Sequence, residues 1–338
     1  MPVDSRFFAS DGAVTLEKWA ELAKASLIGD PSLEATGVSS STSAVSGDVC
    51  FFEGKPEDAK RVSPHAVACL VKEDAAQHLP NGVAALICDA PRLMHARAGG
   101  ALFKVRPLVA SQAGVSSDAK VHPSAEISDG VIVCAGAAIG ERTLIGPGTV
   151  IGPGVQIGRD CVFGAHLSIE CSLIGDRVTL ASGVRIGQAG FGVIGSADGA
   201  EDVPQFGRVI LQDDVTIGAN STVDRGAFDD TIIGERSKID NLCHIGHNVV
   251  VGRDVAIAAY GGISGSCTIG DGARLGGRAG VADHVRIGVG SSLAAGSGVF
   301  RDIPDGETWG GTPARPLREY MREVAWVNKQ IRQRKKPK

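Results

Sequence analysis

A large hydrophobic residue returns at every sixth position along most of the second half of the chain. The run begins at Val121 and reaches Ile169 without a polar interruption. After a slip of one residue it resumes at Ile174, and after an insertion it resumes at Leu211. A last block of twelve consecutive positions extends over 233–299. Neither the period of an α-helix nor that of a simple strand explains this spacing.

Six residues accommodate one short strand and one corner, with a single hydrophobic side chain pointing inward. Glycine often follows that inward residue, as at Gly146, Gly246 and Gly252, where it relieves crowding at a corner. Three such sides close a triangular coil of about eighteen residues, and coils stack as parallel strands ~4.8 Å apart. The pattern therefore predicts a parallel β-helix of roughly ten coils over residues 121–303.

The chain as a whole divides into three regions. Residues 1–115 lack the six-residue period and predict an α/β domain, with a helix over 15–24 and short apolar runs at 67–71 and 83–88. Residues 116–305 are predicted to be the β-helix domain. In residues 306–338, Pro313 and Pro316 precede an amphipathic helix. One face of that helix is apolar and comprises Leu317, Tyr320, Met321, Val324, Val327 and Ile331.

Composition narrows the class of protein. Hydrophobic residues make up 43% of the chain but aromatic residues only 4%, so aliphatic side chains must fill the core. The 46 glycines show no three-residue period, which excludes collagen, and the apolar content excludes disorder. No apolar run approaches the ~18 residues of a membrane span, and the start lacks the order of a signal peptide. We therefore expect a cytoplasmic protein whose eight cysteines, none in a C-x-x-C motif, are reduced and buried.

The net charge of −4 is unevenly distributed. Nine Lys and Arg face only Glu319 and Glu323 between Arg315 and Lys338, which gives this tail a charge of +7 and the rest −11. A basic end of this kind favours an acidic partner. Nucleic acid is disfavoured as a partner, because the tail lacks interleaved aromatic residues and the body is acidic.

Three of the eight histidines attract attention because of where the repeat places them. One coil beyond His247 lies Gly265, and one coil further lies Asp283, beside His284. We expect these residues on one face of the helix, within about two coil rises, or ~10 Å. A base next to a glycine N–H suits acyl transfer, in which one group removes a proton and the other stabilises an oxyanion. The spacing is equally compatible with a structural histidine at a corner.

Several polar residues could orient the His247 imidazole. Asp240, Asn241 and Asn248 surround it in sequence, and the sequence does not choose among them. His244 directly precedes an inward residue, so it has either a packing role or a role at the substrate. A covalent relay through Cys243 or Cys267 is disfavoured, since neither has an activating neighbour.

The insertion between Ile186 and Leu211 interrupts the repeat. Long loops on rigid scaffolds are usually functional or disordered. The aromatic residues Phe191 and Phe206 are unusual for a disordered loop, so the segment, with Gln205, is predicted to face the substrate.

Four long motifs give the chain a resemblance to a known family. They read IGQAGFG at 186–192, PQFGRV at 204–209, IGANSTVDRGAFDDTIIGE at 217–235 and KIDNLCHIGHNV at 238–249. GGTPARPLREY follows at 310–320. With these motifs, the chain resembles the UDP-3-O-(3-hydroxyacyl)glucosamine N-acyltransferase family of lipid A biosynthesis. The resemblance implies a left-handed parallel β-helix with an N-terminal α/β domain and a C-terminal helix.

The resemblance also implies roles for particular residues. His247 would be the general base, His284 a second functional histidine, and the Gly265 backbone the oxyanion donor. The family is homotrimeric, with active sites between neighbouring helices. It takes a 3-hydroxyacyl group from the phosphopantetheine of acyl carrier protein to the 2-amino group of an O-acylated UDP-glucosamine, and needs no metal or other cofactor. Contacts to the carrier are expected at Arg301, Arg315 and Arg318. Because the product carries two acyl chains, peripheral contact with the inner membrane is a further expectation.

One stretch departs from the family pattern. Where relatives read F-L-S-N-P-K-Y for uridine binding, residues 51–57 read FFEGKPE. Phe51 remains available to stack on uracil, but Gly54 replaces the asparagine and Glu57 the tyrosine. The alternative acceptor is therefore a different nucleotide-linked amino sugar. Two remote alternatives are a zinc β-helix enzyme, for which His284 lies too far from His247, and a non-catalytic scaffold, which needs no histidine cluster.

Overall fold

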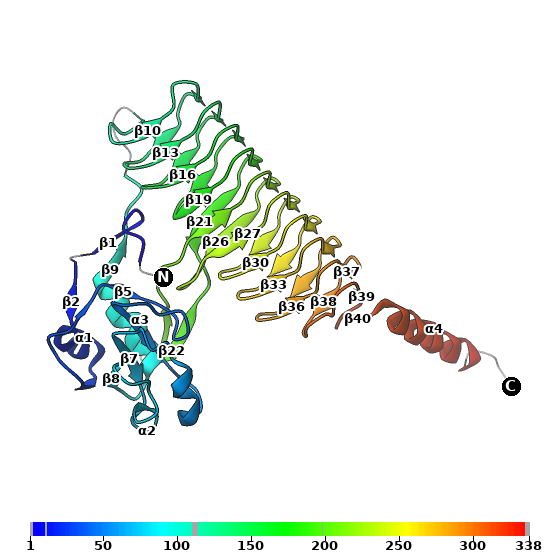
Figure 1. The fold of residues 1–338 in the computed structure, drawn as a ribbon. Helices are drawn as coiled ribbons and strands as arrows, with labels where there is room; N and C mark the ends of the chain where they lie inside the picture. The colour runs from blue at the N-terminus through cyan, green and yellow to red at the C-terminus, as the bar shows by residue number, and fades with distance from the viewer. Residues whose placement is uncertain (1–2, 11, 110–113, 198, 335–338) are drawn as a thin grey trace. The chain divides into compact units, whose positions relative to one another are not determined.

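The computed structural model describes residues 3–10, 12–109, 114–197 and 199–334. The chain forms two compact units (Figure 1). The first unit comprises Met1–Val109, Ala189–Arg208 and Arg225–Asp230, and the second comprises Ala110–Gln188, Val209–Asp224 and Thr231–Lys338. Residues 189–208 and 225–230, which interrupt the six-residue pattern, therefore belong to the first unit.

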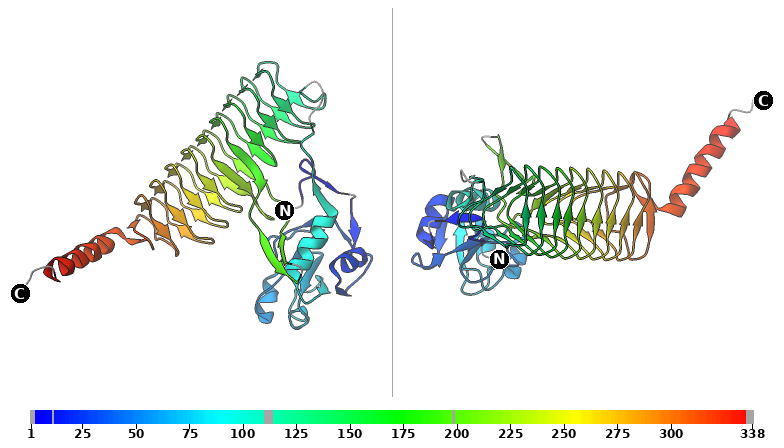
Figure 2. Two further views of the ribbon diagram at one scale, coloured as in Figure 1. Left: turned by 180° about the vertical axis from the view of Figure 1, so that it is seen from behind. Right: turned by 90° about the horizontal axis from the view of Figure 1, so that it is seen from above.

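The second unit is a parallel β-helix, as predicted. Successive coils stack along its length, and each side of the coil contributes one short strand (Figure 2). Each strand pairs in parallel with the strand one coil further on, as in the register Ile139↔Ile157. Within the described residues the three resulting sheets contain nine, eleven and nine strands.

The chain passes through the three sides of each coil in the same order. The first side comprises β10 (Lys120–Val121), β13 (Ala138–Ile139), β16 (Gln156–Ile157), β19 (Ser172–Ile174), β24 (Val209–Leu211), β27 (Thr231–Ile233), β30 (Val250–Val251), β33 (Thr268–Ile269) and β36 (Arg286–Ile287). The second side comprises β11 (Glu126–Ile127), β14 (Leu144–Ile145), β17 (Val162–Phe163), β20 (Thr179–Leu180), β25 (Thr216–Ile217), β28 (Lys238–Ile239), β31 (Ala256–Ile257), β34 (Arg274–Leu275), β37 (Ser292–Leu293), β39 (Thr308–Gly310) and the antiparallel β40 (Arg315–Pro316). The third side comprises β12 (Ile132–Val133), β15 (Val150–Ile151), β18 (Ser168–Ile169), β21 (Arg185–Ala189), β26 (Thr222–Arg225), β29 (His244–Ile245), β32 (Gly262–Ile263), β35 (Gly280–Val281) and β38 (Gly298–Val299).

The core of the β-helix consists of the residues that the period identified. From Val133 to Val299 every one of the predicted inward positions is buried, while Val121 and Ile127 in the first coil are half-buried. The register tolerates all three breaks in the pattern, since Ile157 pairs with Ile174, Ile174 with Leu211, and Leu211 with Ile233. The hydrophobic column is therefore continuous even where the coil length changes.

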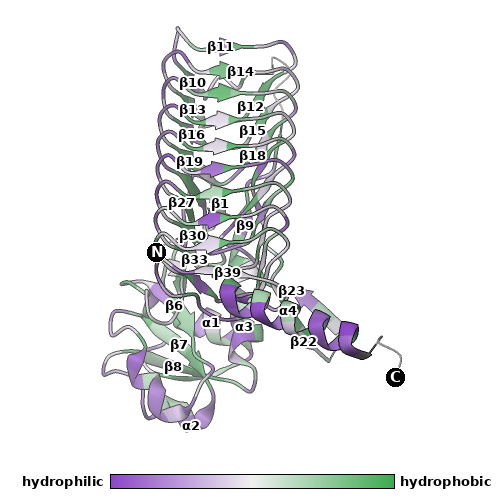
Figure 3. Cartoon of the chain, turned by 90° about the vertical axis from the view of Figure 1, so that its right-hand side faces the viewer, coloured by the Kyte–Doolittle hydropathy of each residue, from purple (hydrophilic) through white to green (hydrophobic). Residues whose placement is uncertain are grey.

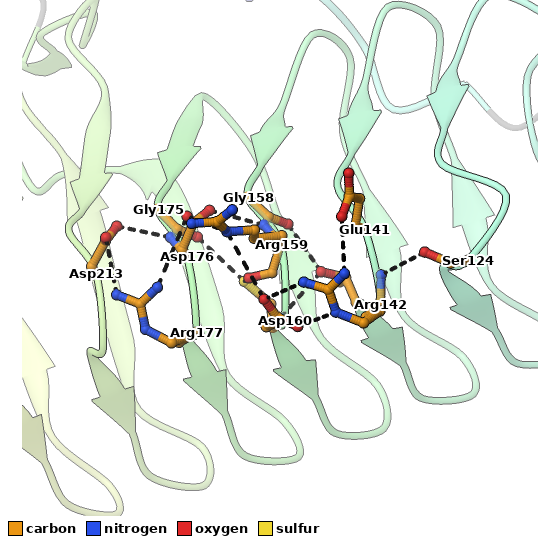
Figure 4. A network of polar contacts seen from close by, with 12 residues as sticks. Ser124, Glu141, Arg142, Gly158, Arg159, Asp160, Gly175, Asp176, Arg177 and Asp213 are labelled. Atoms are coloured by element: carbon orange, nitrogen blue, oxygen red, sulfur yellow. Dashed lines mark hydrogen bonds and ion pairs between the residues drawn. The ribbon is translucent and has the colours of Figure 1, made fainter.

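The corner between the first and second sides carries a column of alternating charge. Arg142 bonds Asp160 through Nε and Nη2 at 2.6 and 2.8 Å, and one coil beyond Asp160 follows Arg177 (Figure 4). The alternation continues through Asp214 and Arg236 to Asp254 (bonds at 2.8 Å between the last two). These side chains are largely exposed, so each ion pair contributes little to stability. The alternation nevertheless keeps like charges from stacking on this corner.

The first unit contains a five-stranded mixed sheet in the order β3-β8-β7-β6-β5. Its strands are β3 (Ser26–Ile28), β5 (Gly37–Val38), β6 (Asp48–Phe51), β7 (Ala68–Val71) and β8 (Ala84–Ile87), and β5 to β8 run parallel. The unit also contains two antiparallel strand pairs, β1 (Phe8–Ser10) with β9 (Phe103–Val105) and β2 (Val14–Thr15) with β4 (Glu34–Ala35). Its other short elements are the 3₁₀ turn η1 (Pro56–Arg61) and the helix α2 (Glu73–Ala76).

Two longer helices cover this sheet. Helix α1 (Leu16–Ala23) begins after Thr15, whose hydroxyl accepts a hydrogen bond from the Lys18 N–H at 3.3 Å. It ends at Lys24 in the left-handed conformation, which confirms the helix predicted over 15–24. Helix α3 is Pro91–Leu102.

The segment inserted into the β-helix is ordered within the first unit. It contains the antiparallel pair β22 (Val193–Ser196) and β23 (Gly199–Asp202). Glu201 of β23 accepts two hydrogen bonds from Arg97 of α3, the Nε one at 2.9 Å. Arg208 bonds Asp230 at 2.8 Å and Asp4 at 3.0 Å. Partly buried ion pairs of this kind hold both interruptions of the repeat to the N-terminal residues.

Helix α4 (Leu317–Arg334) is the last described element of the second unit. It confirms the helix that the apolar face predicted. Its first turn meets the last coil: a side chain at Gly310 would clash with Leu317, and one at Gly311 with Tyr320. Beyond Tyr320 most of its residues are exposed. The basic residues Lys335, Lys336 and Lys338 lie outside the described residues.

Candidate active site

His247 lies at the corner between the third and first sides, two residues after the end of β29. The next residue, Asn248, has a φ of 60°, a left-handed conformation that asparagine adopts more readily than most residues. Its N–H donates to the hydroxyl of Thr231 at 2.9 Å. The His247 carbonyl accepts from the Ser266 N–H of the next coil at 2.8 Å. The backbone that carries the imidazole is thus fixed on both sides.

The side chain of Asn248 also orients the ring. Its Oδ1 lies 3.1 Å from His247 Nδ1. When Nδ1 carries the proton and donates it to this oxygen, Nε2 keeps a free lone pair, as a general base requires. Of the three residues that sequence left open for this role, Asn248 is the one the chain brings to the ring.

Gly265 lies under the imidazole in the next coil. A Cβ at this position would lie 2.6 Å from both Cε1 and Nε2 of His247, far inside van der Waals contact. Only glycine therefore leaves room for the ring in this position. The predicted stacking of His247 and Gly265 is what the structure shows.

The N–H of Gly265 is also available to a ligand. At equivalent corner positions a side-chain oxygen accepts this bond: Asp271 from Arg253 at 2.9 Å, Asp240 from Ala259 at 3.2 Å, and Asp305 from Val289 at 2.9 Å. Among the described residues nothing accepts a hydrogen bond from the Gly265 N–H. An open N–H beside the Nε2 of a base is the arrangement that oxyanion stabilisation needs.

His284 lies one coil further along the same corner. Its N–H donates to the Gly265 carbonyl at 3.1 Å, and its Nδ1 is 3.2 Å from Asp283 Oδ2. Both side chains are about three-quarters exposed. The imidazole is therefore free to reach a substrate that lies along this corner.

The other polar candidates near His247 in sequence lie elsewhere on the coil. Asp240 and Asn241 occupy the corner between the second and third sides, where they accept bonds from the N–H groups of Ala259 and Ala219. They contact backbone there and not the His247 ring. His244 lies on the outer surface of the third side, its Nδ1 2.7 Å from the Thr222 hydroxyl and its Nε2 3.6 Å from Asp224. It is half exposed, so it is not a packing residue.

Residues predicted to bind substrate in the first unit have different surroundings. Phe206 is 4% exposed and its ring contacts Phe8 and Phe103 at 5.8 and 5.9 Å, so it is a core residue. Gln205 is also buried and donates to the Val203 carbonyl. Both side chains are buried in the single chain, and the substrate contact expected of them stays a prediction.

Two other aromatic candidates in this unit remain accessible. Phe191 is 87% exposed. Phe51, at the end of β6, is half-buried, and its ring lies 5.2 Å from that of His95.

The first unit also contains a cavity of about 570 Å³ next to the altered 51–57 stretch. It lies at the carboxyl ends of the parallel strands β6, β7 and β8, where α/β proteins commonly bind ligands. Glu53 accepts from the Arg92 N–H at 3.0 Å at the start of α3. Three charged lining residues, the basic Lys72 and Arg92 and the acidic Asp89, were not predicted from the sequence, although each follows soon after a strand.

The three arginines expected to contact a carrier protein lie near the end of the β-helix. Arg301 is exposed and its guanidinium lies 5.1 Å from the Trp309 ring centroid. Arg315 lies over Tyr320 at 5.6 Å and bonds Glu323. Arg318 is exposed on the first turn of α4.

Comparison with known proteins agrees with this geometry. A family model described as "Bacterial transferase hexapeptide (six repeats)" matches residues 136–171 and 230–265, and "Hexapeptide repeat of succinyl-transferase" matches 157–188 and 267–301. The UDP-3-O-acylglucosamine N-acyltransferase of Caulobacter sp. (strain K31) is 48% identical over 332 residues, 96% of each chain. That of a Methylorubrum extorquens strain is 48% identical over 332 residues, 95% of each chain. The chain belongs to the UDP-3-O-acylglucosamine N-acyltransferase family.

The cysteines of this acyltransferase are unsuited to a covalent relay. All eight lie in the described residues, where none forms a disulfide, and seven are buried. Burial raises the pKa of the Cys243 thiol and of the Cys267 thiol, so neither forms a thiolate readily.

A helix that crosses a bilayer needs about 20 consecutive, mostly apolar residues. In the described ranges, no helix is long and apolar enough to cross a membrane. Helix α4, the longest, carries many charged residues.

Proposed function

We propose that this acyltransferase moves a 3-hydroxyacyl group from the phosphopantetheine arm of acyl carrier protein to the 2-amino group of a UDP-3-O-acylglucosamine, in lipid A biosynthesis. The observation that carries the proposal is the His247 imidazole, oriented by Asn248, above Gly265 and its open N–H. The family to which the chain belongs supports UDP-3-O-acylglucosamine as the acceptor. The resemblance of the DRGA and IGHN motifs supports acyl carrier protein as the donor.

In the proposed reaction, His247 Nε2 accepts a proton from the acceptor amine as the nitrogen attacks the thioester carbonyl. A C–N bond forms, and the carbonyl oxygen becomes an oxyanion that accepts a hydrogen bond from the Gly265 N–H. The C–S bond then breaks as the oxyanion collapses. The imidazolium returns its proton to the leaving sulfur, so His247 is neutral again after each turnover. His284 is proposed to bind the substrate along the same corner.

The cavity of the first unit is the proposed nucleotide site. Lys72 and Arg92, which line the cavity together with the acidic Glu53, Asp74 and Asp89, supply positive charge for phosphate groups. Phe51 ends the strand that leads to the cavity. Gly54 lines it where relatives carry an asparagine, and Glu57 follows shortly after. Because these replacements remove an amide and an aromatic ring, a different nucleotide-linked amino sugar is the second candidate acceptor.

A homotrimer is the proposed assembly. The resemblance implies it, and α4 supports it, since Leu317, Tyr320, Val324, Val327 and Ile331 follow the three- and four-residue spacing of a coiled-coil seam. Val327 and Ile331 are 47% and 49% exposed in the single chain, so the seam lacks its packing partner. Arg301, Arg315 and Arg318 are proposed to contact the acidic carrier, in agreement with their charge.

The proposal is tested by an acylation assay on purified full-length protein. The donor is 3-hydroxyacyl carrier protein, and the acceptors are UDP-3-O-acylglucosamine and, in parallel, UDP-linked amino sugars that differ in the acylated position. Mass spectrometry of the product identifies the amide formed. We expect acylation of UDP-3-O-acylglucosamine.

Replacing residues of the cavity separates the two candidate acceptors. Gly54→Asn with Glu57→Tyr restores the family residues and should lower the KM for UDP-3-O-acylglucosamine with little change in kcat. If another amino-sugar nucleotide is acylated and UDP-3-O-acylglucosamine is not, the second candidate is correct. If no amino-sugar nucleotide is acylated, the proposed reaction is wrong.

A further inference from the structure

Helix α4 has two faces of different chemistry. The seam defined above, Leu317, Tyr320, Val324, Val327 and Ile331, occupies the a and d positions of two heptads. The positions most distant from that seam form what we call the outer face. Beyond the first turn its large side chains are Arg322, Trp326, Lys329 and Arg332, all exposed.

Trp326 is the unexpected member of the outer face. It is 62% exposed, although the large apolar ring of tryptophan is usually mostly buried in a folded protein. The two other tryptophans of the chain, Trp19 and Trp309, are 1% and 5% exposed. Packing of the seam against copies of the chain would leave Trp326 uncovered, because it points away from that seam.

Basic residues surround Trp326 on the helix surface. Arg322 precedes it by four residues and Lys329 follows it by three, the spacings at which helical side chains are neighbours. The sequence of α4 holds two acidic residues, Glu319 and Glu323. Glu323 is also a neighbour of Trp326 at a spacing of three, but an ion pair with Arg315 offsets its charge. Figure 3 accordingly colours much of α4 as hydrophilic. A positive field thus lies around a single aromatic ring.

The positive charge increases toward the end of the chain. Five of the seven residues from Arg332 to Lys338 are basic: Arg332, Arg334, Lys335, Lys336 and Lys338. Clusters of four to eight Lys and Arg beside an amphipathic helix are typical of segments that bind anionic lipid headgroups. Tryptophan is enriched at the level of those headgroups, where its ring is buried and its N–H stays wet.

We propose that the outer face of α4, with Trp326 as its anchor, docks on the surface of a bilayer that contains anionic phospholipid. The basic side chains meet the phosphates and Trp326 enters the headgroup region, while the seam stays within the protein assembly. The helix lies on the membrane and does not span it. This surface goes beyond the proposed reaction, but it suits it, because an acceptor and a product with acyl chains are amphiphilic.

The distribution of tryptophans makes the test direct. Full-length protein is mixed with vesicles of phosphatidylcholine alone or with about a third phosphatidylglycerol, and tryptophan emission and co-sedimentation are measured. Since Trp19 and Trp309 are already buried, a shift of emission to shorter wavelength reports Trp326. We expect the shift and co-sedimentation only with the anionic vesicles, and weaker binding as salt increases.

Variants separate a specific face from general attraction of charge. The triple variant Arg322→Gln, Lys329→Gln, Arg332→Gln should bind anionic vesicles about a hundredfold more weakly. Trp326→Ala should weaken co-sedimentation without changing net charge. The matched control, Lys24→Gln, Lys60→Gln, Lys120→Gln, removes three exposed cations elsewhere and should bind like the unmodified protein.

Four results would overturn the proposal. One is no binding to anionic vesicles, and another is equal binding to neutral ones, which would indicate insertion of the seam. A third is equal weakening in the control variant. The fourth is an emission shift with an acidic carrier protein but not with vesicles, which would assign the outer face to the carrier.

Discussion

At the scale of single residues, the chemistry of the acyltransferase depends on the missing side chain at position 265. The His247 ring occupies the space that a Cβ of Gly265 would take, and the Gly265 N–H stays open where equivalent positions are capped by aspartate. The spacing of one coil was enough to predict that these two residues stack. It could not identify Asn248 as the partner of the ring, because that depends on a side-chain rotamer and on a left-handed backbone.

Adding one methyl group at Gly265 tests this geometry. In Gly265→Ala the new Cβ, 2.6 Å from the ring, forces His247 to move while the fold remains. We expect kcat to fall about 100-fold, the loss typical of displacing a catalytic group by about 1 Å. Gly277→Ala is the matched control, since it adds a Cβ at an equivalent corner position whose nearest neighbour is 3.4 Å away. Equal activities of the two variants would contradict the account.

His95 provides a residue-scale prediction about pH. Burial lowers its pKa to about 4 from the ordinary 6.5, and its Nε2 hydrogen bonds the Val49 carbonyl at 3.0 Å. The unfolded state binds the proton more readily than the folded state does. The contribution of neutral His95 to the free energy of unfolding is therefore complete above pH 6.5, and it decreases as the pH falls toward 4. The decrease should be on the order of 3 kcal/mol.

Thermal unfolding at pH 7 and pH 5 checks this expectation. His95→Phe should be less stable at pH 7, because it leaves the Val49 carbonyl without its donor. It should nevertheless lose less stability than the unmodified protein between the two pH values. The same pH dependence in both proteins would show that another group is responsible.

At the scale of elements, the six-residue period predicted almost every strand of the β-helix because one inward residue per side is a strict requirement of the coil. The structure of the 186–211 insertion was not predictable in this way. Its strands β22 and β23 are short, and they are ordered by distant contacts, such as Glu201 with Arg97. The same distant packing explains why Phe206 is a core residue.

Truncating one inward side chain tests the coil. Ile257 is 2% exposed, so Ile257→Ala should leave a cavity and lower the free energy of unfolding of the β-helix by about 2–5 kcal/mol. Arg274→Ala, on the same side but pointing outward, should change it by less than about 0.5 kcal/mol. Chemical denaturation followed by circular dichroism measures both. Similar values for the two variants would mean that the inward column is assigned wrongly.

The seam of α4 makes a separate prediction. Val324→Glu with Val327→Glu places charges at the proposed contact between copies and should reduce the mass from that of a trimer, while far-ultraviolet circular dichroism shows an intact β-helix. Ala325→Glu, on the outer face, should leave the assembly unchanged. Light scattering after size-exclusion chromatography gives the masses. A trimer that survives the double substitution would show that the seam does not hold the assembly.

At the scale of the whole molecule, the chain joins a repetitive scaffold to an α/β unit that draws on three separate stretches of sequence. The motifs and the period together predicted the fold class and the acyltransferase family. They could not show that residues 225–230 belong with the first unit. That grouping arises from three-dimensional contacts, among them Arg208 with Asp230 and Phe228 with Phe51.

The most direct test of the central claim is the single-turnover rate of acyl transfer from 3-hydroxyacyl carrier protein to UDP-3-O-acylglucosamine in His247→Gln. Loss of the base should slow the chemical step by about 10³-fold, within the range known for general bases. His122→Gln, which removes an exposed histidine from the first coil, should react at the unmodified rate. A His247→Gln rate within about fivefold of the unmodified enzyme would contradict the assignment of His247 as the base.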